Sequence, residues 1–278
     1  MNTIVEMLSF SFISRALLVG ILISLCASLL GASLVLKRYS MIGDGLSHVG
    51  YGALAVAAAF NLSPLYVAIP VVVITAFFLL RLSKNSRLNG DALIAIISCS
   101  ALSIGMIVVS VFEVNIDVNS YMFGSILALQ DEDVVLSLIS SFVVIALYVL
   151  FYNKIFAVTF DESFSKATGI KTGLYNGLIA LLTAVVTVVG MRLMGALLIS
   201  GLIIFPSLSA MRICKSYKGV TLFSVLISVL CFITGLTVTF YLPVPTGACI
   251  VVINLLVFVI CAFIGKLKET VSINTKGS

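Results

Sequence analysis

The chain has 278 residues, of which 61% are hydrophobic and only 10% charged, whereas a soluble domain is nearer half apolar and a quarter charged. This composition excludes an ordinary soluble protein, and the absence of apolar–polar alternation in its apolar blocks excludes a transmembrane β-barrel. The net charge of +5 is explained by basic loops on one side of a membrane, and we expect no nucleic-acid partner.

About nine apolar blocks follow one another along the chain, each of about 17 to 25 residues, the length that crosses a bilayer as a helix. They predict an all-α, polytopic membrane protein in a lipid bilayer. Eight spans are the alternative, because only Met191 and Arg192 separate the sixth and seventh blocks. The blocks are 16–36, 42–60, 65–82, 92–112, 134–152, 174–190, 193–211, 220–241 and 247–264.

Basic residues predict the orientation. With the N-terminus outside, 14 of the 16 lysines and arginines fall in inner loops, and only Arg15 and Arg192 lie outside. The connection 113–133 has five acids and no base, so we expect it outside. An odd number of spans places the C-terminus in the cytoplasm. Residues 1–268 are predicted to form a single transmembrane domain, and 269–278 a flexible cytoplasmic tail.

The inner connection 153–173 is predicted to contain one short amphipathic helix. Asp161 and Glu162 suit its first turn, where the helix dipole favours acids, and Gly169 is placed to end it. A solvated loop helix and a docking element for a cytoplasmic partner are both compatible with this pattern. The apolar positions at helical spacing are Phe160, Phe164 and Ala167.

The second apolar block, "IGDGLSHVGYGALAVAAAF", contains Asp44 and the only histidine of the chain, His48. Their i, i+4 spacing puts them on one helix face, which Gly52 continues. A rise of ~1.5 Å per residue places His48 roughly 15 Å beyond Arg38, near the middle of the bilayer. The many small residues of the block, Gly43 among them, predict a helix packed closely among others.

Three interpretations of this pair remain open from the residues alone. It is a structural hydrogen-bonded pair, a site for a divalent transition metal such as zinc or manganese, or a proton relay in a coupled carrier. Ionisable groups are costly inside a membrane, which favours the two functional interpretations. A metal would need further ligands, from other side chains, water or a second copy of the chain.

Four stretches carry a resemblance to a known family: "LKRYSMIGDGLSHVGYGALA" (36–55), "LSIGMIVVS" leading into "NSYMFGSILALQDED" (102–133), "FDESFSKATGI" (160–170) and "MGALLISGLIIFPSLSAMR" (194–212). The chain resembles the permease subunits of bacterial ABC transporters that import zinc, manganese or iron, with most likeness to the zinc-uptake permeases. One departure is "VGYGA" after His48, where relatives often have a more aliphatic run.

The resemblance implies a homodimeric pore in the bacterial plasma (inner) membrane. Two copies of a cytoplasmic ATPase dock beneath it, and an extracytoplasmic metal-binding protein docks above. The permease is not an enzyme: ATP is used by the partner, in agreement with the lack of a GxxxxGK[ST] loop in this sequence. The resemblance also implies that the transported ion is Zn²⁺ or, next, Mn²⁺, and that no cofactor is bound permanently.

The resemblance also assigns residues. It makes Asp44 and His48 the transmembrane metal site. The stretch 160–170 becomes the helix that couples to the ATPase, through Asp161, Glu162, Phe164, Ala167 and Gly169. Helix packing near the path is assigned to Gly43, Gly52, Gly195 and Pro206. A proton-coupled carrier and a membrane scaffold remain the alternative functions, but neither needs both the pair and the inner helix.

Overall fold

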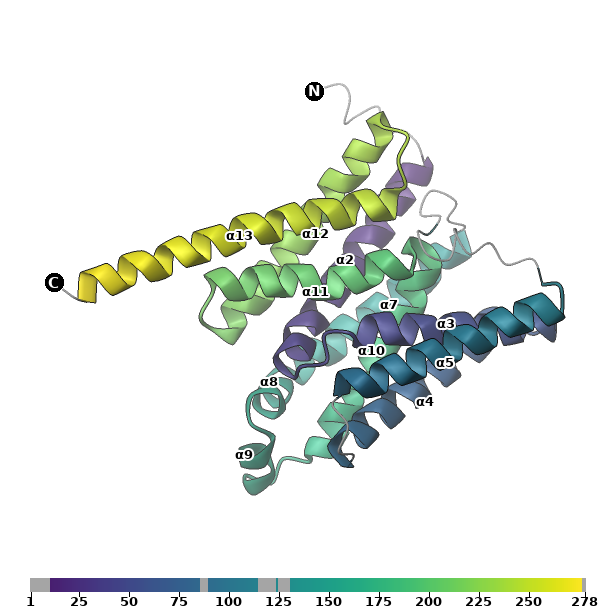
Figure 1. Cartoon of the computed structure of the whole chain (residues 1–278), viewed down its shortest axis with the longest axis horizontal. Helices are drawn as coiled ribbons and strands as arrows, with labels where there is room; N and C mark the ends of the chain where they lie inside the picture. Colours follow the sequence, from purple (N-terminus) through teal and green to yellow (C-terminus); the bar gives the residue numbers. More distant parts are fainter. Residues whose placement is uncertain (1–10, 86–89, 115–123, 125–130, 277–278) are drawn as a thin grey trace.

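The structure is a computed structural model that describes residues 11–85, 90–114, 124 and 131–276 (Figure 1). Within these residues the regular elements are all helices. The helices are α2 (Ser11–Leu36), α3 (Ile42–Ala59), α4 (Pro64–Asn85), α5 (Gly90–Val111), α7 (Asp131–Leu150), α8 (Tyr152–Phe160), α9 (Glu162–Ala167), α10 (Thr172–Met194), α11 (Ala196–Ile213), α12 (Tyr217–Tyr241) and α13 (Thr246–Lys276).

Each of the nine predicted blocks coincides with a helix, so the polytopic all-α fold is confirmed. Eight of these helices are long and apolar enough to cross a membrane. The remaining one is α3, which carries the titratable pair. Helix α13 continues to Lys276, into the segment 269–278 that was expected to be a tail, and the flexibility of that segment stays a prediction.

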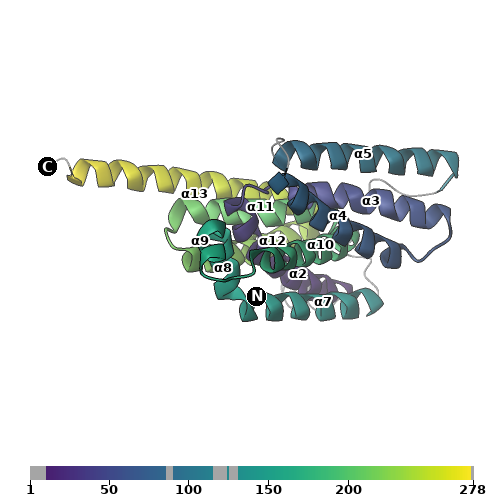
Figure 2. The ribbon, with the colours of Figure 1, turned by 90° about the horizontal axis from the view of Figure 1, so that it is seen from below.

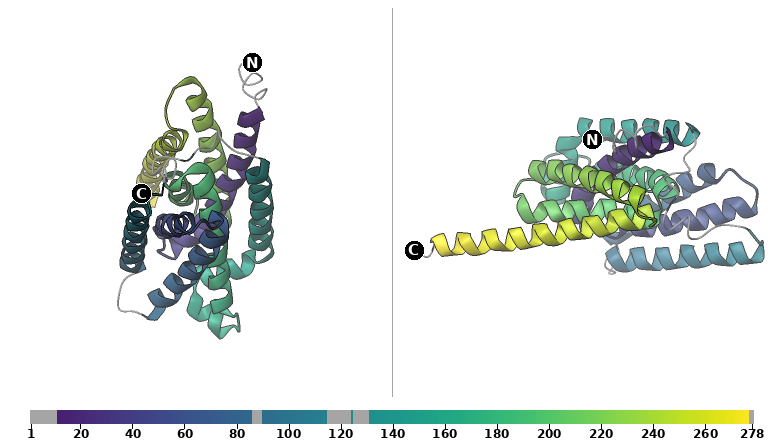
Figure 3. Two further views of the ribbon diagram at one scale, coloured as in Figure 1. Left: turned by 90° about the vertical axis from the view of Figure 1, so that its right-hand side faces the viewer. Right: turned by 90° about the horizontal axis from the view of Figure 1, so that it is seen from above.

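Helices α2, α10 and α11 form the centre of the bundle. Most of the span in α10 is buried, whereas only 22% of the spans in α5 and α13 is. Helices α3, α4 and α5 pack together on one side, and α12 and α13 pack against α2 and α11 on the other (Figures 1 and 2). Helix α13 extends beyond the other helices toward the C-terminus (Figure 3).

The sixth and seventh spans are separate helices, as predicted, but the boundary between them was misplaced. Helix α10 runs through Met191 and Arg192 and ends at Met194, and Gly195 separates it from α11. Gly195 has φ 91°, a left-handed conformation that side chains disfavour and glycine adopts freely. The break therefore depends on the backbone freedom of Gly195 rather than on Met191 and Arg192.

Ion pairs mark one end of the bundle. Arg15 at the start of α2 pairs with Asp131 at 2.7 Å, and Arg192 near the end of α10 pairs with Asp133 at 3.4 Å. The two basic residues predicted on the outer side thus bind acids of the predicted outer connection. Most of 113–133 lies outside the described residues, and which end faces out stays a prediction.

Candidate metal site and coupling helix

Helix α3 is buried among α4, α5, α10 and α11 because its glycines allow close approach. A Cβ added to Gly52 would lie 2.7 Å from the Ala101 carbonyl oxygen of α5. A Cβ on Gly43 would lie 2.7 Å from Ile203 Cδ1 of α11. Both predicted packing glycines therefore lie at helix contacts that fix α3 against α5 and α11.

Asp44 and His48 lie on one face of α3, as their spacing predicts. The Oδ2 atom of Asp44 and the Nε2 atom of His48 are 3.6 Å apart, longer than a hydrogen bond. The Asp44 side chain is 39% exposed and that of His48 21%. The Nδ1 atom of His48 is buried with no hydrogen-bond partner in the described structure. The pair thus offers one carboxylate and one imidazole nitrogen that face each other.

The face that carries the pair lies between two neighbouring helices. Gly43 contacts α11, whereas Gly45 and Gly52 contact α5. With 3.6 residues per turn, Asp44 and His48 lie between these two contact faces. Partial exposure of both side chains shows that this part of α3 is less covered than its glycine faces.

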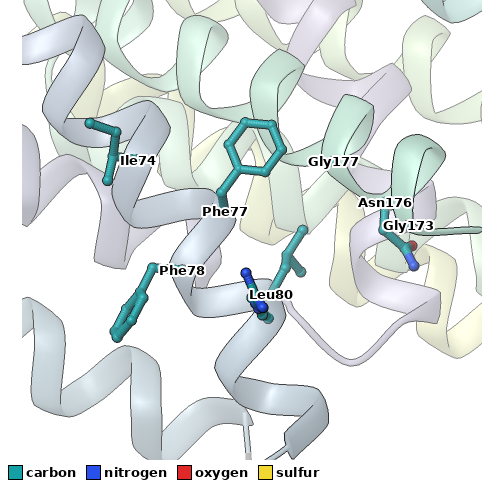
Figure 4. Close-up of a pocket in the computed structure, with 8 residues that line it drawn as sticks. Ile74, Phe77, Phe78, Leu80, Gly173, Asn176 and Gly177 are labelled. Atoms are coloured by element: carbon teal, nitrogen blue, oxygen red, sulfur yellow. The ribbon is translucent and has the colours of Figure 1, made fainter.

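Two side chains do not complete a metal shell. Among the described residues, no group of three or more His, Cys, Asp or Glu side chains could hold a metal ion. A cavity of about 430 Å³ between α4 and α10 (Figure 4) is lined by neither Asp44 nor His48. The same is true of a cavity of about 410 Å³ among α3, α4 and α5. Within the described residues, the pair is therefore not joined by a third side chain of these four types.

The inner connection contains two helices instead of the single predicted one. Asp161 has extended backbone angles and separates α8 from α9, so Phe160 belongs to the first helix and Phe164 to the second. The Oδ1 atom of Asp161 accepts a hydrogen bond from the Phe164 amide at 2.9 Å, which caps α9. The apolar spacing was continuous, but this cap starts a new helix.

The predicted end of this helix at Gly169 is confirmed. Gly169 has φ 81°, and the Ile170 amide donates to the Ser165 carbonyl at 2.9 Å, as in a Schellman motif. Phe164 is 65% exposed, and Ala167 at the last position of α9 is exposed too. Helix α9 thus presents an apolar side chain away from the bundle, whereas Glu162 accepts a hydrogen bond from Asn176 of α10.

Sequence reasoning missed Asn176, in the second turn of α10. Its side-chain amide donates to Glu162 Oε2 at 3.1 Å, and its Oδ1 accepts from the Lys37 ammonium at 2.6 Å. A polar amide at the start of an apolar span was the available signal. In the sequence, Lys37 is only one of the 14 basic residues of the predicted inner loops.

Pro206, the last predicted packing residue, is buried within α11, which continues through it. Helix α2 approaches α11 one turn earlier, where a Cβ on Gly31 would lie 2.0 Å from the Ile203 carbonyl oxygen. Pro206 therefore lies beside a close helix contact, as the prediction of a packing role requires. Gly31 was not singled out from the sequence.

Spanning helices that enclose a carboxylate–imidazole pair define a multi-pass membrane protein with a polar site in its bundle. Residues 9–265 match the model of the ABC 3 transport family. The chain belongs to this family, which confirms the resemblance seen in the sequence.

Individual relatives cover nearly the whole chain. The high-affinity zinc uptake system membrane protein ZnuB of Haemophilus influenzae is 27% identical, over 91% of this chain and 98% of that protein. The manganese import system permease protein ScaB of Streptococcus gordonii is 28% identical, over 92% of each. The solved structure of PsaBC from Streptococcus pneumoniae in complex with Fab has a TM-score of 0.83 and 27% identity, over 94% of each chain. The prediction of a transport subunit rather than an enzyme is confirmed.

Proposed function

We propose that this chain is the permease subunit of an ABC importer that moves a divalent transition metal, zinc before manganese, into the cytoplasm. A separate ATPase, in two copies, drives it, and an extracytoplasmic metal-binding protein delivers the ion. The names of the relatives, which include both a zinc and a manganese system, support metal uptake without deciding the ion.

The separation of Asp44 and His48 carries the proposal. At metal–ligand distances of about 2.1 Å, an N···O separation of 3.6 Å corresponds to an N–metal–O angle of about 118°. This value is near the tetrahedral angle that zinc prefers. Octahedral coordination would need an N–metal–O angle of about 90° and therefore a shorter N···O separation. The pair therefore fits zinc better than an octahedral ion.

The exposure of the pair supports a second copy of the chain as the neighbour that covers it. Asp44 is 39% exposed on the face of α3 between α5 and α11. A carboxylate in this position is costly in lipid, and a symmetry-related copy or a water-filled path between two copies would solvate it. In the same proposal, α9 is the element that docks on the ATPase, because its exposed Phe164 offers an apolar anchor.

Reconstitution tests this proposal. The chain is assembled in liposomes with its ATPase and binding protein, and ATP-dependent uptake of zinc and of manganese is measured. We expect Asp44→Ala and His48→Ala each to lower zinc uptake by at least about tenfold, because each removes one of two side-chain ligands. The control Asp91→Ala removes an exposed carboxylate from the first turn of α5 and should leave uptake unchanged.

Normal uptake by both site variants would refute the assignment of the metal site. Manganese uptake without zinc uptake would reverse the order of the ions. Uptake that runs on a pH gradient without the ATPase would replace the proposed function by a proton-coupled carrier.

A further inference from the structure

Two hydrogen bonds of the Asn176 side chain join three segments at the end of the bundle where α9 lies. Asn176 is 5% exposed, and both ends of its amide are engaged. Its oxygen accepts from Lys37 at 2.6 Å and its nitrogen donates to Glu162 at 3.1 Å. Hydrogen bonds to charged groups are among the stronger ones in proteins, and the low dielectric of a buried site strengthens them further.

Glu162 and Lys37, the two residues that Asn176 joins, lie in different segments of the bundle. Glu162 is the first residue of α9, a six-residue helix whose other side chains are mostly exposed. Lys37 follows the last residue of α2 and precedes α3, seven positions before Asp44. Asn176 therefore connects the helix proposed to dock on the ATPase with the turn that leads into the metal-site helix.

The turn between α2 and α3 is strained. Arg38 has φ 62°, and the Tyr39 amide donates to the Leu34 carbonyl at 2.9 Å, so α2 ends in a left-handed cap without a glycine. Such conformations persist only where surrounding contacts hold them. The bond from the neighbouring Lys37 to Asn176 is one such contact, so its loss removes part of what holds the turn.

The side of Asn176 toward α4 is open. Asn176, Gly173 and Gly177 of α10 line the cavity of about 430 Å³ together with Phe77 and Arg81 of α4 (Figure 4). A Cβ added to Gly173 would meet no atom within 4 Å, whereas one on Gly177 would lie 2.7 Å from the Phe77 ring. The first turn of α10 is thus loosely packed on this side, whereas the contacts of Asn176 to Glu162 and Lys37 are direct.

We propose that Glu162, Asn176 and Lys37 form a coupling relay, which transmits displacement of α9 to the α2–α3 turn and from there to Asp44 and His48. This inference rests on the proposed function. Asn176 acts as a positioning residue: it touches neither the ion nor the partner, and it sets how far motion of one segment moves the other.

The relay is tested by the number of zinc ions transported per ATP hydrolysed, measured in the reconstituted complex. We expect Asn176→Leu to lower this ratio by about tenfold while ATP hydrolysis continues, since it removes two charge-assisted hydrogen bonds. The matched control is Asn254→Leu, which removes a buried amide whose partner among the described residues is the Ile250 carbonyl of its own helix, α13. The control should leave the ratio unchanged.

An exchange of groups separates a relay from a general structural role. Asn176→Asp keeps the acceptor for Lys37 but places a carboxylate against Glu162, so the ratio should fall about tenfold. In the double variant N176D/E162Q the new glutamine amide donates to the new aspartate, and we expect the ratio to return to within about twofold of the original.

The outcomes distinguish the two proposals. If the unmodified complex shows no ATP-dependent uptake, the proposed function fails. If it transports and N176D keeps the original ratio, the relay alone is refuted. A lowered ratio in N176D that E162Q does not restore also refutes the relay, because a loss of packing or stability is not repaired by the exchange.

Discussion

Substitution of Gly52 by alanine tests the close packing of α3, the helix that carries Asp44 and His48. The added Cβ would lie 2.7 Å from the Ala101 carbonyl oxygen, whereas ordinary contact begins at 3.4 Å. A backbone oxygen inside α5 cannot rotate away, so α3 and α5 must separate by several tenths of an ångström. Overpacking of this kind costs about 1–3 kcal/mol, and the better helix propensity of alanine returns only about 0.5–1 kcal/mol.

Thermal unfolding of the purified protein in detergent measures this cost, at about 2–4 °C in Tm for each kcal/mol. Gly201→Ala is the matched control within a span. It makes the same change and gains the same helix propensity, but its Cβ meets a methyl group of Val251 at 3.1 Å, which can move. We expect Gly52→Ala to lower Tm by at least twice as much as the control. Equal shifts would refute the argument that backbone contact decides the cost.

Three further predictions concern the ends and the core of the bundle. Gly169→Ala should speed hydrogen exchange of the Ile170 amide, because φ 81° is strained for alanine. The control is Gly173→Ala, whose added Cβ also meets no atom within 4 Å but whose φ is not positive, and it should leave this exchange unchanged. Equal exchange in the two variants would contradict the prediction. Asp133→Asn should lower Tm more than Asp131→Asn, since the side chains are 14% and 82% exposed and exposed ion pairs contribute little; the reverse order would disprove it. Tyr217→Phe removes a buried hydroxyl that bonds two others and should cost about 1–3 kcal/mol in unfolding experiments; an unchanged Tm would count against it.

The spans were predictable because a bilayer imposes both length and apolarity on every helix that crosses it. The exact residues at which the spans end were less predictable. Met191 and Arg192 seemed to separate two spans, yet a pair of residues with helical backbone angles does not interrupt a helix. The interruption came at Gly195, whose φ of 91° depends on backbone conformation that hydropathy does not register.

The titratable pair was predictable because Asp44 and His48 are ionisable residues within an otherwise apolar block. The i, i+4 spacing fixed their common face, and the structure places them 3.6 Å apart. Asn176 could not be found in this way. Its partners lie 139 and 14 positions away in the chain, and their contacts depend on how α2, α9 and α10 pack. Tertiary contacts of this range carry no local pattern.

The sparse ligation of the pair agrees with the proposed transport. Structural zinc sites surround the ion with four side chains and retain it. A site on a transport path must bind strongly enough for the ion to enter and weakly enough for it to leave. Under the proposed function, Asp44 and His48 would supply two ligands, both partly exposed, which leaves the remaining positions of the shell open to exchange. Under the proposed function, the missing ligands are therefore what allows the relay to move the ion onward instead of storing it.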